Sequence, residues 1–453
     1  MQKRMLMPSV SPDRLNHSYI TGISFIAALG GYLFGFDFAV IAGGLPFLQK
    51  YFGLDAYWEG FTTGSLALGA MAGCILAGYV AERLGRKPAL LMAAFIFTIS
   101  SLAMAFSPTR NFFIASRFVA GVGVGMASML SPMYIAELAP PQIRGRLVAI
   151  NQLTIVLGIL VTNLVNYSLR NSGDDAWRWM FGSGAIPSLI FFAGLLALPE
   201  SPRWLVMKNK KERAMQVLNK IGNTRFANKA VEDIEKSMQV ATAGVRYHGV
   251  FNKLFFPAVF TGIVLAIFQQ FCGINTVFNY TPKLFERIGA SADDQLLQTV
   301  FIGVVNLVFT LLAMLLVDKI GRKPLMIGGA AGLGILYVII AQLLGAGNPA
   351  VAWFLLAAIG TYALTLAPVT WVLIAEIFPN KVRTTATTIA VLCLWAAYFI
   401  LVFTFPILFE KLGDRTFYVY AVVCLGGLLF TLKYVKETRG KALEEMNPVV
   451  SGH

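Results

Sequence analysis

Charged side chains are scarce in this sequence of 453 residues. Asp, Glu, Lys and Arg together make up 13% of the chain and hydrophobic residues make up 57%, whereas a soluble domain carries about 25% charged residues. The mean hydropathy is +0.68. Water is therefore not the main solvent of this fold.

Cysteine is also rare, and its spacing excludes two kinds of site. The cysteines stand singly inside apolar stretches, without the spacing of a disulfide framework or of metal ligands. The apolar stretches also lack a nucleophile accompanied by a base and an orienting residue. We therefore expect no enzyme activity, no catalytic residue, no metal site and no cofactor. The residues expected to serve in packing are Cys74, Cys272, Cys393 and Cys424.

A phosphate-binding loop is missing as well. Gly121, Gly123 and Gly125 are spaced like a glycine-rich loop. They lie inside an apolar stretch, however, and no Gly-Lys-Ser/Thr element accompanies them. We expect these glycines to allow close helix packing instead.

Long apolar stretches fill most of the chain. Uncharged stretches of about 20 residues, enough to cross a hydrocarbon core of about 30 Å, recur about twelve times. A β-barrel would need short alternating strands rather than unbroken runs such as 303–317. The sequence thus predicts an all-α membrane protein. The expected spans lie near 19–43, 57–81, 88–107, 111–138, 145–168, 178–198, 256–282, 297–317, 324–344, 350–378, 384–409 and 415–435.

Basic residues are distributed unevenly about these spans. The net charge of +14 alone would be compatible with a nucleic-acid partner. Of the 37 Lys and Arg residues, however, about 28 fall on one side of the expected spans. This distribution predicts a multi-pass protein with both chain ends and residues 203–253 in the cytoplasm. We expect the lipid bilayer, and not nucleic acid, as its partner.

Two charged motifs occur twice in the same order. Residues 82–88 (ERLGRKP) return as 318–324 (DKIGRKP), an offset of 236 residues. Residues 137–140 (ELAP) return as 376–379 (EIFP), an offset of 239 residues. Repeated halves let a transporter expose a central site to each side in turn, although a duplication retained only for stability would leave the same trace. The expected segments are 1–18 (cytoplasmic), 19–198 (first six-helix bundle), 199–255 (linker helices), 256–435 (second six-helix bundle) and 436–453 (cytoplasmic tail).

The linker between the halves carries an amphipathic pattern. Residues 207–239 are rich in Lys, Glu and Asn, and their apolar residues share one helical face. We expect short helices under the membrane here. The apolar face is formed by Ala214, Val217, Leu218 and Ile221.

The repeated charged motifs lie where the expected spans meet the cytoplasm. Arginines of the first motif and glutamates of the second can pair at this boundary, and such pairs could lock the cytoplasmic side and release it when the halves move. Ordinary anchoring by positive residues is the alternative. The predicted cytoplasmic gate comprises Glu82, Arg83, Arg86, Glu137, Arg144, Asp318, Arg322, Glu376 and Arg383.

Two charged residues interrupt the spans themselves. Asp37 lies deep in the first span and Arg117 in the fourth, and a charge at bilayer depth is costly enough to indicate a function. We hypothesise that protonation of Asp37 frees Arg117 and lets the halves close around a substrate. A static buried ion pair is the alternative.

Amide side chains gather in the fifth, seventh and eighth spans. Amides offer both donors and acceptors, which matches a neutral solute rich in hydroxyl groups, and unpaired amides in lipid are expensive. Aromatic side chains can present flat faces to a sugar ring, although in a helix bundle they more often serve packing. The candidate binding residues are Gln152, Gln269, Gln270, Asn275 and Asn306, with Trp371, Phe34 and Tyr362 as aromatic candidates.

With these residues, the sequence resembles the sugar porter family of the major facilitator superfamily from about residue 30 to 445. The marks of the resemblance are residues 132–137 with Arg144, 199–204 (PESPRW), 269–275 (QQFCGIN) and 437–440 (ETRG). The resemblance implies twelve helices in two pseudo-symmetric six-helix bundles, cytoplasmic linking helices and a monosaccharide bound near mid-membrane. It also implies that the amides and Trp371 contact sugar, and that the pair of Asp37 and Arg117 is that of proton-coupled members.

Several positions depart from the family pattern. Asn279 stands where the family usually has a Tyr, and Ala367 replaces a Gly before the proline of the tenth span. Leu394 and Tyr398 occupy positions where many members carry Asn or Gln. The expected pocket is therefore rearranged and includes Asn279, so glucose and xylose both stay candidates.

The combined expectation is a monosaccharide:proton symporter of the bacterial cytoplasmic (inner) membrane. It is expected to work as a monomer by alternating access, with the proton as coupling ion. A facilitative uniporter with a permanent pair between Asp37 and Arg117 is one alternative. A sugar receptor that has lost transport is another.

Overall fold

The computed structural model describes residues 15–241, 252, 255–378 and 382–437. Within these ranges the chain is built of helices, with no strand. The helices are α1 (His17–Phe52), α2 (Ala56–Arg83), α3 (Arg86–Ala105), α4 (Arg110–Leu138), α5 (Arg144–Leu169), α6 (Ala176–Gly182), α7 (Ala185–Ala197), α8 (Pro202–Met207), α9 (Lys211–Ile221), α10 (Thr224–Ala241), α11 (Phe256–Phe271), α12 (Ile274–Glu286), α13 (Ala292–Ile320), α14 (Arg322–Gly345), α15 (Val351–Leu364), α16 (Leu366–Ile377), α17 (Arg383–Leu412) and α18 (Thr416–Tyr434).

Twelve passes are long and apolar enough to cross a membrane. The described residues contain 11 candidate spans, and the last of them, Thr385–Tyr434, covers two passes, which are α18 and nearly all of α17. Three of the expected spans are each made of two helices: α6 with α7, α11 with α12, and α15 with α16. The predicted all-α membrane fold is confirmed, while these three interruptions were not foreseen.

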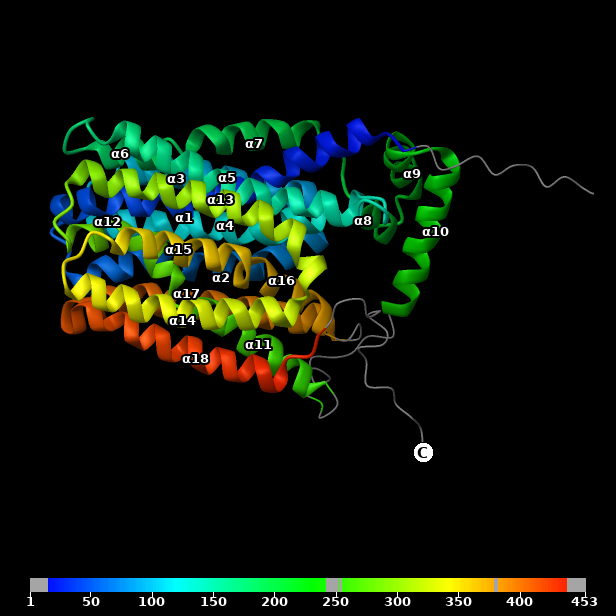
Figure 1. The fold of residues 1–453 in the computed structure, drawn as a ribbon. Helices are drawn as coiled ribbons and strands as arrows, with labels where there is room; N and C mark the ends of the chain where they lie inside the picture. The colour runs from blue at the N-terminus through cyan, green and yellow to red at the C-terminus, as the bar shows by residue number, and fades with distance from the viewer. Residues whose placement is uncertain (1–14, 242–251, 253–254, 379–381, 438–453) are drawn as a thin grey trace, which may run out of the picture.

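Helices of each half pack mainly on one another. We call α1–α7 the first half and α11–α18 the second half. In the first half α1 packs on α5 and α2 on α4; in the second, α14 packs on α18 and α11 on α17. The halves meet through α2 with α17, α5 with α13, and α1 with α12. In Figure 1 the long helices run side by side, and α8, α9 and α10 lie at one end, which we call the linker end; the opposite end is the far end.

Polar residues at the far end start several of these helices. The Asp55 carboxylate accepts a hydrogen bond from the Trp58 amide over 2.8 Å and caps α2. The Thr109 hydroxyl caps α4 in the same way. Such caps satisfy amide groups that have no partner inside the first turn, so they define where the passes begin.

Small residues let α2 and α4 approach closely. A Cβ added to Gly121 would lie 2.2 Å from the Leu66 carbonyl oxygen, and one added to Gly125 would lie 2.2 Å from the Ala70 carbonyl oxygen. Since backbone atoms cannot yield to such an overlap, only glycine fits at these two positions. The expected packing role of these glycines is confirmed.

The linker forms amphipathic helices as expected. α9 and α10 lie at the linker end (Figure 1). In α9 the buried residues are the four whose spacing predicted an apolar face, Ala214, Val217, Leu218 and Ile221. The boundaries drawn between the five expected segments stay predictions.

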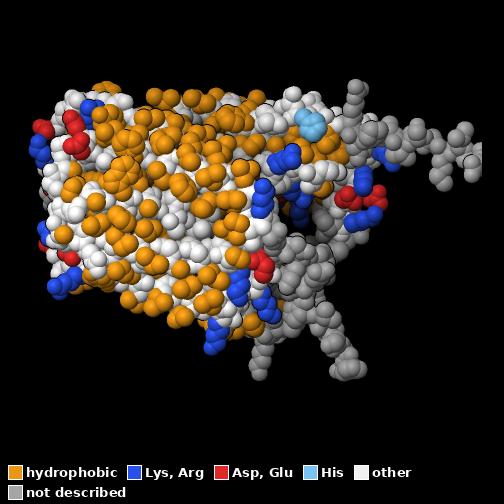
Figure 2. All heavy atoms as spheres, in the orientation of Figure 1, with side chains coloured by type: hydrophobic (Ala, Val, Ile, Leu, Met, Phe, Trp, Pro, Cys, Tyr) orange, Lys and Arg blue, Asp and Glu red, His pale blue; other side chains and the backbone are white. Residues whose placement is uncertain are grey.

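Apolar side chains cover the sides of the bundle, whereas charged ones gather at its two ends (Figure 2). Large hydrophobic residues such as Phe106 and Trp353 are 78% and 72% exposed. An exposed apolar belt between charged ends matches the hydrocarbon layer of a bilayer.

Candidate transport site

The pass made of α11 and α12 is interrupted at Gly273. The φ angle of Gly273 is 88°, in the left-handed region, and a Cβ there would lie 2.5 Å from the ring of Tyr420. Glycine adopts this conformation without steric cost. The break places polar residues within the membrane-spanning bundle, as in the discontinuous helices of transporters.

Side-chain amides form a chain of hydrogen bonds around this break. Gln270 Nε2 donates to Gln269 Oε1 over 3.4 Å, and Asn275 Nδ2 donates to Gln270 Oε1. One turn further on, Asn279 Nδ2 donates to the Asn275 carbonyl over 2.8 Å and to the Tyr398 hydroxyl of α17 over 3.0 Å. All five residues are buried. Four of the predicted binding residues therefore lie together, and Tyr398 joins them.

A second interrupted pass lies beside the first. At Thr365, between α15 and α16, the backbone leaves the helical region with φ −122° and ψ −85°. Gln269 Nε2 donates to the carbonyl oxygen of Ala367 over 3.4 Å, just after this break. The Gln269 side chain therefore links the helix break at Gly273 to the helix break at Thr365.

The three aromatic candidates lie on three different helices, and their contact with a sugar stays a prediction. Phe34 of α1 packs edge-on against Trp395 of α17, with ring centroids 5.6 Å apart. Tyr362 is half-buried in α15, and Trp371 is 42% exposed on α16. No ring contact joins Phe34, Tyr362 and Trp371 within the described ranges. The aromatic neighbour that sequence reasoning missed is Trp395.

Two other predicted binding residues lie on helices that meet between the halves. Gln152 is half-buried on α5, and Asn306 is 6% exposed on α13; α5 and α13 pack against each other. Among the residues described, no hydrogen bond joins either side chain to the amide chain. Their contact with a solute stays a prediction.

Asp37 and Arg117 are brought together inside the first half. Asp37 Oδ1 on α1 lies 3.5 Å from Arg117 Nη1 on α4, and both side chains are fully buried. Within the part of the chain that the structure describes, neither carboxylate oxygen nor any guanidinium nitrogen makes a hydrogen bond. A buried pair needs excellent geometry and further hydrogen bonds to repay its desolvation. No further hydrogen bond therefore offsets the desolvation of this pair within the described residues.

The gate motif of the first half forms a buried network at the linker end. Arg86 Nε and Nη2 donate to the two carboxylate oxygens of Glu137 over 3.0 and 2.9 Å. Arg86 Nη1 donates to the Ala81 carbonyl over 3.0 Å, and the Ser201 hydroxyl donates to Glu137. A two-pronged guanidinium contact of this kind fixes orientation as well as distance.

The second half repeats this network at equivalent positions. Arg322 Nη2 donates to Glu376 Oε1 over 3.1 Å, and Arg322 Nη1 donates to the Val317 carbonyl over 3.5 Å. Each of the two ion pairs thus lies inside one half. The predicted pairing of the motif arginines with Glu137 and Glu376 is therefore present, and it ties α3 to α4 and α14 to α16. Its role as a gate stays a prediction.

Two further carboxylates, which the prediction of the gate missed, hold the turns of this motif. Glu200 accepts hydrogen bonds from the backbone amides of Arg86 and Lys87, and Glu437 accepts them from those of Arg322 and Lys323. Burial raises the pKa of the Glu200 carboxyl, and hydrogen bonds from the amides partly offset that rise. The signal was a third repeat, with an offset of 237 residues (200 to 437).

Other predicted gate residues play different parts. The side chains of Glu82 and Arg83 are exposed, and Arg83 stacks on Tyr79 at 4.1 Å from the ring centre. Neither forms an ion pair among the described residues, because the backbone turn points them to solvent. The side chain of Asp318 lies outside the described part of the structure.

Arg144 and Arg383 occupy matching places after α4 and α16. Arg144 Nη2 donates to the Ala139 carbonyl over 3.5 Å, and Arg383 Nε donates to the Phe378 carbonyl over 3.1 Å. Cations at helix carboxyl ends are favoured by the helix dipole. These two residues therefore close the helices that carry the gate glutamates.

Comparison with known proteins assigns this chain to a family. A family model described as "Sugar (and other) transporter" matches residues 23–450. The chain belongs to the sugar transporter family. The protein is accordingly a multi-pass membrane transporter.

Two relatives of this sugar transporter are similar to it along almost their whole length. It is 39% identical to the D-xylose-proton symporter of Escherichia coli (strain K12), covering 95% of this chain and 96% of the relative. It is 36% identical to the arabinose-proton symporter of Bacillus subtilis (strain 168), covering 97% of each. A solved structure described as a partially occluded inward-open conformation of the xylose transporter XylE from E. coli matches with a TM-score of 0.84 at 39% identity, covering 94% of this chain and 100% of that one.

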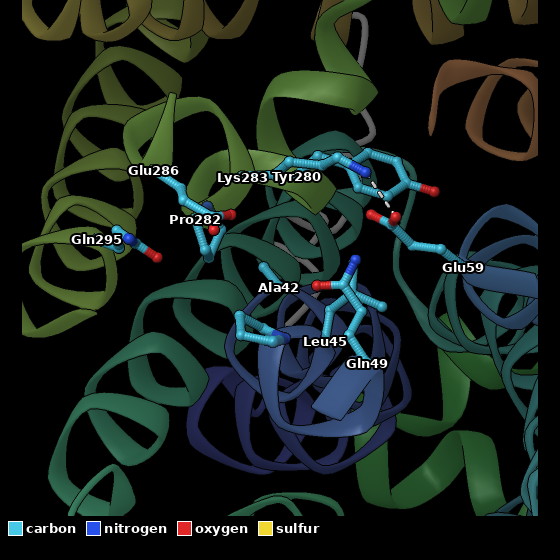
Figure 3. A pocket seen from close by; sticks show the side chains of 10 residues that line it. Ala42, Leu45, Gln49, Glu59, Tyr280, Pro282, Lys283, Glu286 and Gln295 are labelled. Atoms are coloured by element: carbon cyan, nitrogen blue, oxygen red, sulfur yellow. Dashed lines mark hydrogen bonds and ion pairs between the residues drawn. The ribbon is translucent and has the colours of Figure 1, made fainter. Parts of the chain in front are cut away.

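The far end of the sugar transporter is shut, and ion pairs that sequence reasoning missed lie there. Lys283 Nζ of α12 lies 2.6 Å from Glu59 Oε2 of α2, beside a small cavity between the halves (Figure 3). The α2 backbone also touches α17 closely: a Cβ added to Gly60 would lie 2.2 Å from the Phe403 carbonyl oxygen. No sequence spacing pairs Glu59 with Lys283, because they lie on different halves.

Proposed function

We propose that this sugar transporter is a monosaccharide:proton symporter that works by alternating access. The amide chain around the two helix breaks is the sugar site, and the pair of Asp37 and Arg117 is the proton site. The two relatives described above are both named as sugar-proton symporters, which supports this assignment. In this proposal the transporter works as a monomer, because one chain holds both halves. The proton is the coupling ion, and no cofactor takes part.

The linker end is the cytoplasmic end in this proposal. Figure 2 shows a hollow in the surface at the linker end with Lys and Arg side chains near its rim, and an excess of basic residues favours the cytoplasmic side. Since the far end is shut, the structure corresponds to an inward-facing state. The similarity to structures described as partially occluded inward open and as inward open supports this reading. The membrane is then the cytoplasmic membrane, with both chain ends inside.

The buried ion pair without hydrogen bonds carries the proton part of the proposal. Asp37 and Arg117 are fully buried 3.5 Å apart. Protonation of Asp37 would leave Arg117 without its counter-charge inside the bundle, and a buried unpaired charge is strongly unfavourable. Proton binding therefore changes which arrangement of the halves is favoured, as a coupling ion must.

The test is sugar uptake against a gradient in proteoliposomes. Wild-type protein should make the outside medium more alkaline when sugar is added, and Asp37→Asn should abolish uphill uptake while sparing sugar exchange. Asp174→Asn, at an exposed carboxylate paired with Lys50, is the matched control and should leave both unchanged. Uphill uptake that survives Asp37→Asn would remove the proton site.

A facilitative uniporter is the second candidate, favoured by the fact that Asp37 and Arg117 are already in contact. It predicts exchange and downhill flux with no alkalinisation in the wild type. A receptor would bind sugar without flux of either kind. A competition panel of pentoses and hexoses against uptake then gives the sugar, with xylose and arabinose as first members because the relatives are named for them.

A further inference from the structure

Two ion pairs of opposite sense cross between the halves at the far end. Glu59 of the first half meets Lys283 of the second half at 2.6 Å, with side-chain exposures of 2% and 25%. Arg170 of the first half meets Asp293 of the second half at 2.7 Å, with exposures of 21% and 63%. Lys283 belongs to α12, and Asp293 lies at the start of α13. Since exposed pairs contribute little, the buried pair of Glu59 and Lys283 is the one that matters.

Lys283 lies on the short helix that carries two amides of the proposed sugar site. α12 spans 13 residues and includes Asn275 and Asn279, the latter one turn before Lys283. Its backbone leaves helical geometry at Tyr280, with φ −117° and ψ 21°. A change in the partner of Lys283 therefore acts on the same short helix that carries the binding amides.

Each member of the pair has a substitute partner in its own half. Figure 3 shows Gln49 of α1 with its amide directed toward the Glu59 carboxylate. Gln49, Glu59, Lys283 and Glu286 all line the same cavity. Glu286 is exposed on α12, three residues after Lys283, a spacing at which opposite charges meet on a helix. Lys283 can thus exchange Glu59 for Glu286 when α12 moves away from the first half.

We propose that Lys283 is a positioning residue that switches between Glu59 with the far end shut and Glu286 with the far end open. The switch holds α12 against the first half while the linker end is open, and it lowers the cost of release by giving both charges a partner afterwards. This inference rests on the proposed alternating access, but it needs neither a particular sugar nor proton coupling.

A cysteine reporter in the same cavity tests the switch. Ala42 is 2% exposed and lines the cavity, so Ala42→Cys should react with a membrane-impermeant maleimide from outside only when the far end is open. The half-buried Cys393 is replaced by Ser in all variants. Glu59→Gln and Lys283→Met should raise the labelling rate at least about tenfold. Lys283→Arg, which keeps the positive charge, should label at the wild-type rate.

Glu286→Gln distinguishes the switch from a simple clamp, in which the pair of Glu59 and Lys283 holds the far end shut and Glu286 has no role. It removes the partner of the open state, so labelling should fall below the wild-type rate, whereas a simple clamp predicts no change. Glu286 is exposed, so this variant keeps the fold and reports even if Lys283→Met does not. Lys50→Met is the matched control, because its pair with Asp174 lies within the first half.

Sugar kinetics give a second readout. Glu59→Gln should lower the apparent KM for external sugar, because the open state is more populated, and should lower the maximal rate. Unchanged labelling in both Glu59→Gln and Glu286→Gln would overturn the switch and leave the proposed function intact. Altered labelling in variants of a protein that shows no sugar flux would instead overturn the proposed function alone.

Discussion

Asn279 and Tyr398 form the contact that most distinguishes this binding region from the family pattern. The Asn279 amide donates to the Tyr398 hydroxyl over 3.0 Å, and the two side chains are 0% and 2% exposed. Asn279 Oδ1 makes no hydrogen bond within the described residues, so it can accept one from a solute hydroxyl. A large residue on α17 thus faces a small one on α12.

We expect Asn279→Tyr to overfill this contact. The added ring meets Tyr398, and overpacking costs about 1–3 kcal/mol, which a lower thermal midpoint of the purified protein would report. Tyr398→Asn in the same chain should recover most of the loss, since it returns the volume. The sugar ranking should change in the single variant; an unchanged ranking would remove Asn279 from the pocket. Tyr398→Phe, which deletes only the hydroxyl, is the control for volume.

At the scale of elements, the start of α3 and the start of α14 are held in the same way. Gly85 and Gly321 have φ angles of 111° and 104°. A Cβ added to Gly85 would lie 2.2 Å from a carboxylate oxygen of Glu200, and one added to Gly321 would lie 2.8 Å from a carboxylate oxygen of Glu437. Glycine is required there both by the backbone and by the approach of the carboxylate. Each half therefore builds this turn in the same way, from a glycine with a positive φ angle and a glutamate that accepts hydrogen bonds from two backbone amides.

Glu200→Gln and Glu437→Gln should lower stability by similar amounts. Each replaces charge-assisted hydrogen bonds to two backbone amides by neutral ones, a loss of about 1–2 kcal/mol. Thermal unfolding in detergent measures it. Glu82→Gln, at the exposed carboxylate of the same turn, should change stability by no more than about 0.5 kcal/mol. A large effect of Glu82→Gln and none of Glu200→Gln would contradict this assignment.

At the scale of the whole molecule, the seal at the far end depends on backbones that touch. Gly60 of α2 lies against the Phe403 backbone of α17, and a Cβ on Gly303 of α13 would lie 3.0 Å from the Leu160 Cα of α5. These contacts join opposite halves. Closing the far end therefore requires small residues where the halves meet.

We predict that Gly60→Leu keeps the far end open, because its side chain would overlap backbone atoms that cannot move aside. Uptake should fall at least about 100-fold, while labelling of the Ala42→Cys reporter from outside should rise. Gly78→Leu in the same helix, where nothing lies within 4 Å of an added Cβ, should behave as wild type. Uptake near the wild-type rate in Gly60→Leu would show that the far end closes elsewhere.

Much of this architecture could be predicted from the sequence because its cause is local. The bilayer selects long apolar helices, so hydropathy alone located the passes, and the repeat of charged motifs indicated two halves. The packing role of Gly121 and Gly125, the buried face of α9 and the clustering of Gln269, Gln270 and Asn275 also follow from spacing along one chain segment.

Contacts between distant segments were decided only by the tertiary structure. The pairing of Glu59 with Lys283 joins residues 224 positions apart, and the anchoring of Arg86 by Glu200 joins residues 114 apart; no periodicity records such pairs. Composition and spacing determine that this chain crosses a membrane as two repeated halves, whereas the packing of those halves determines which charges hold them together.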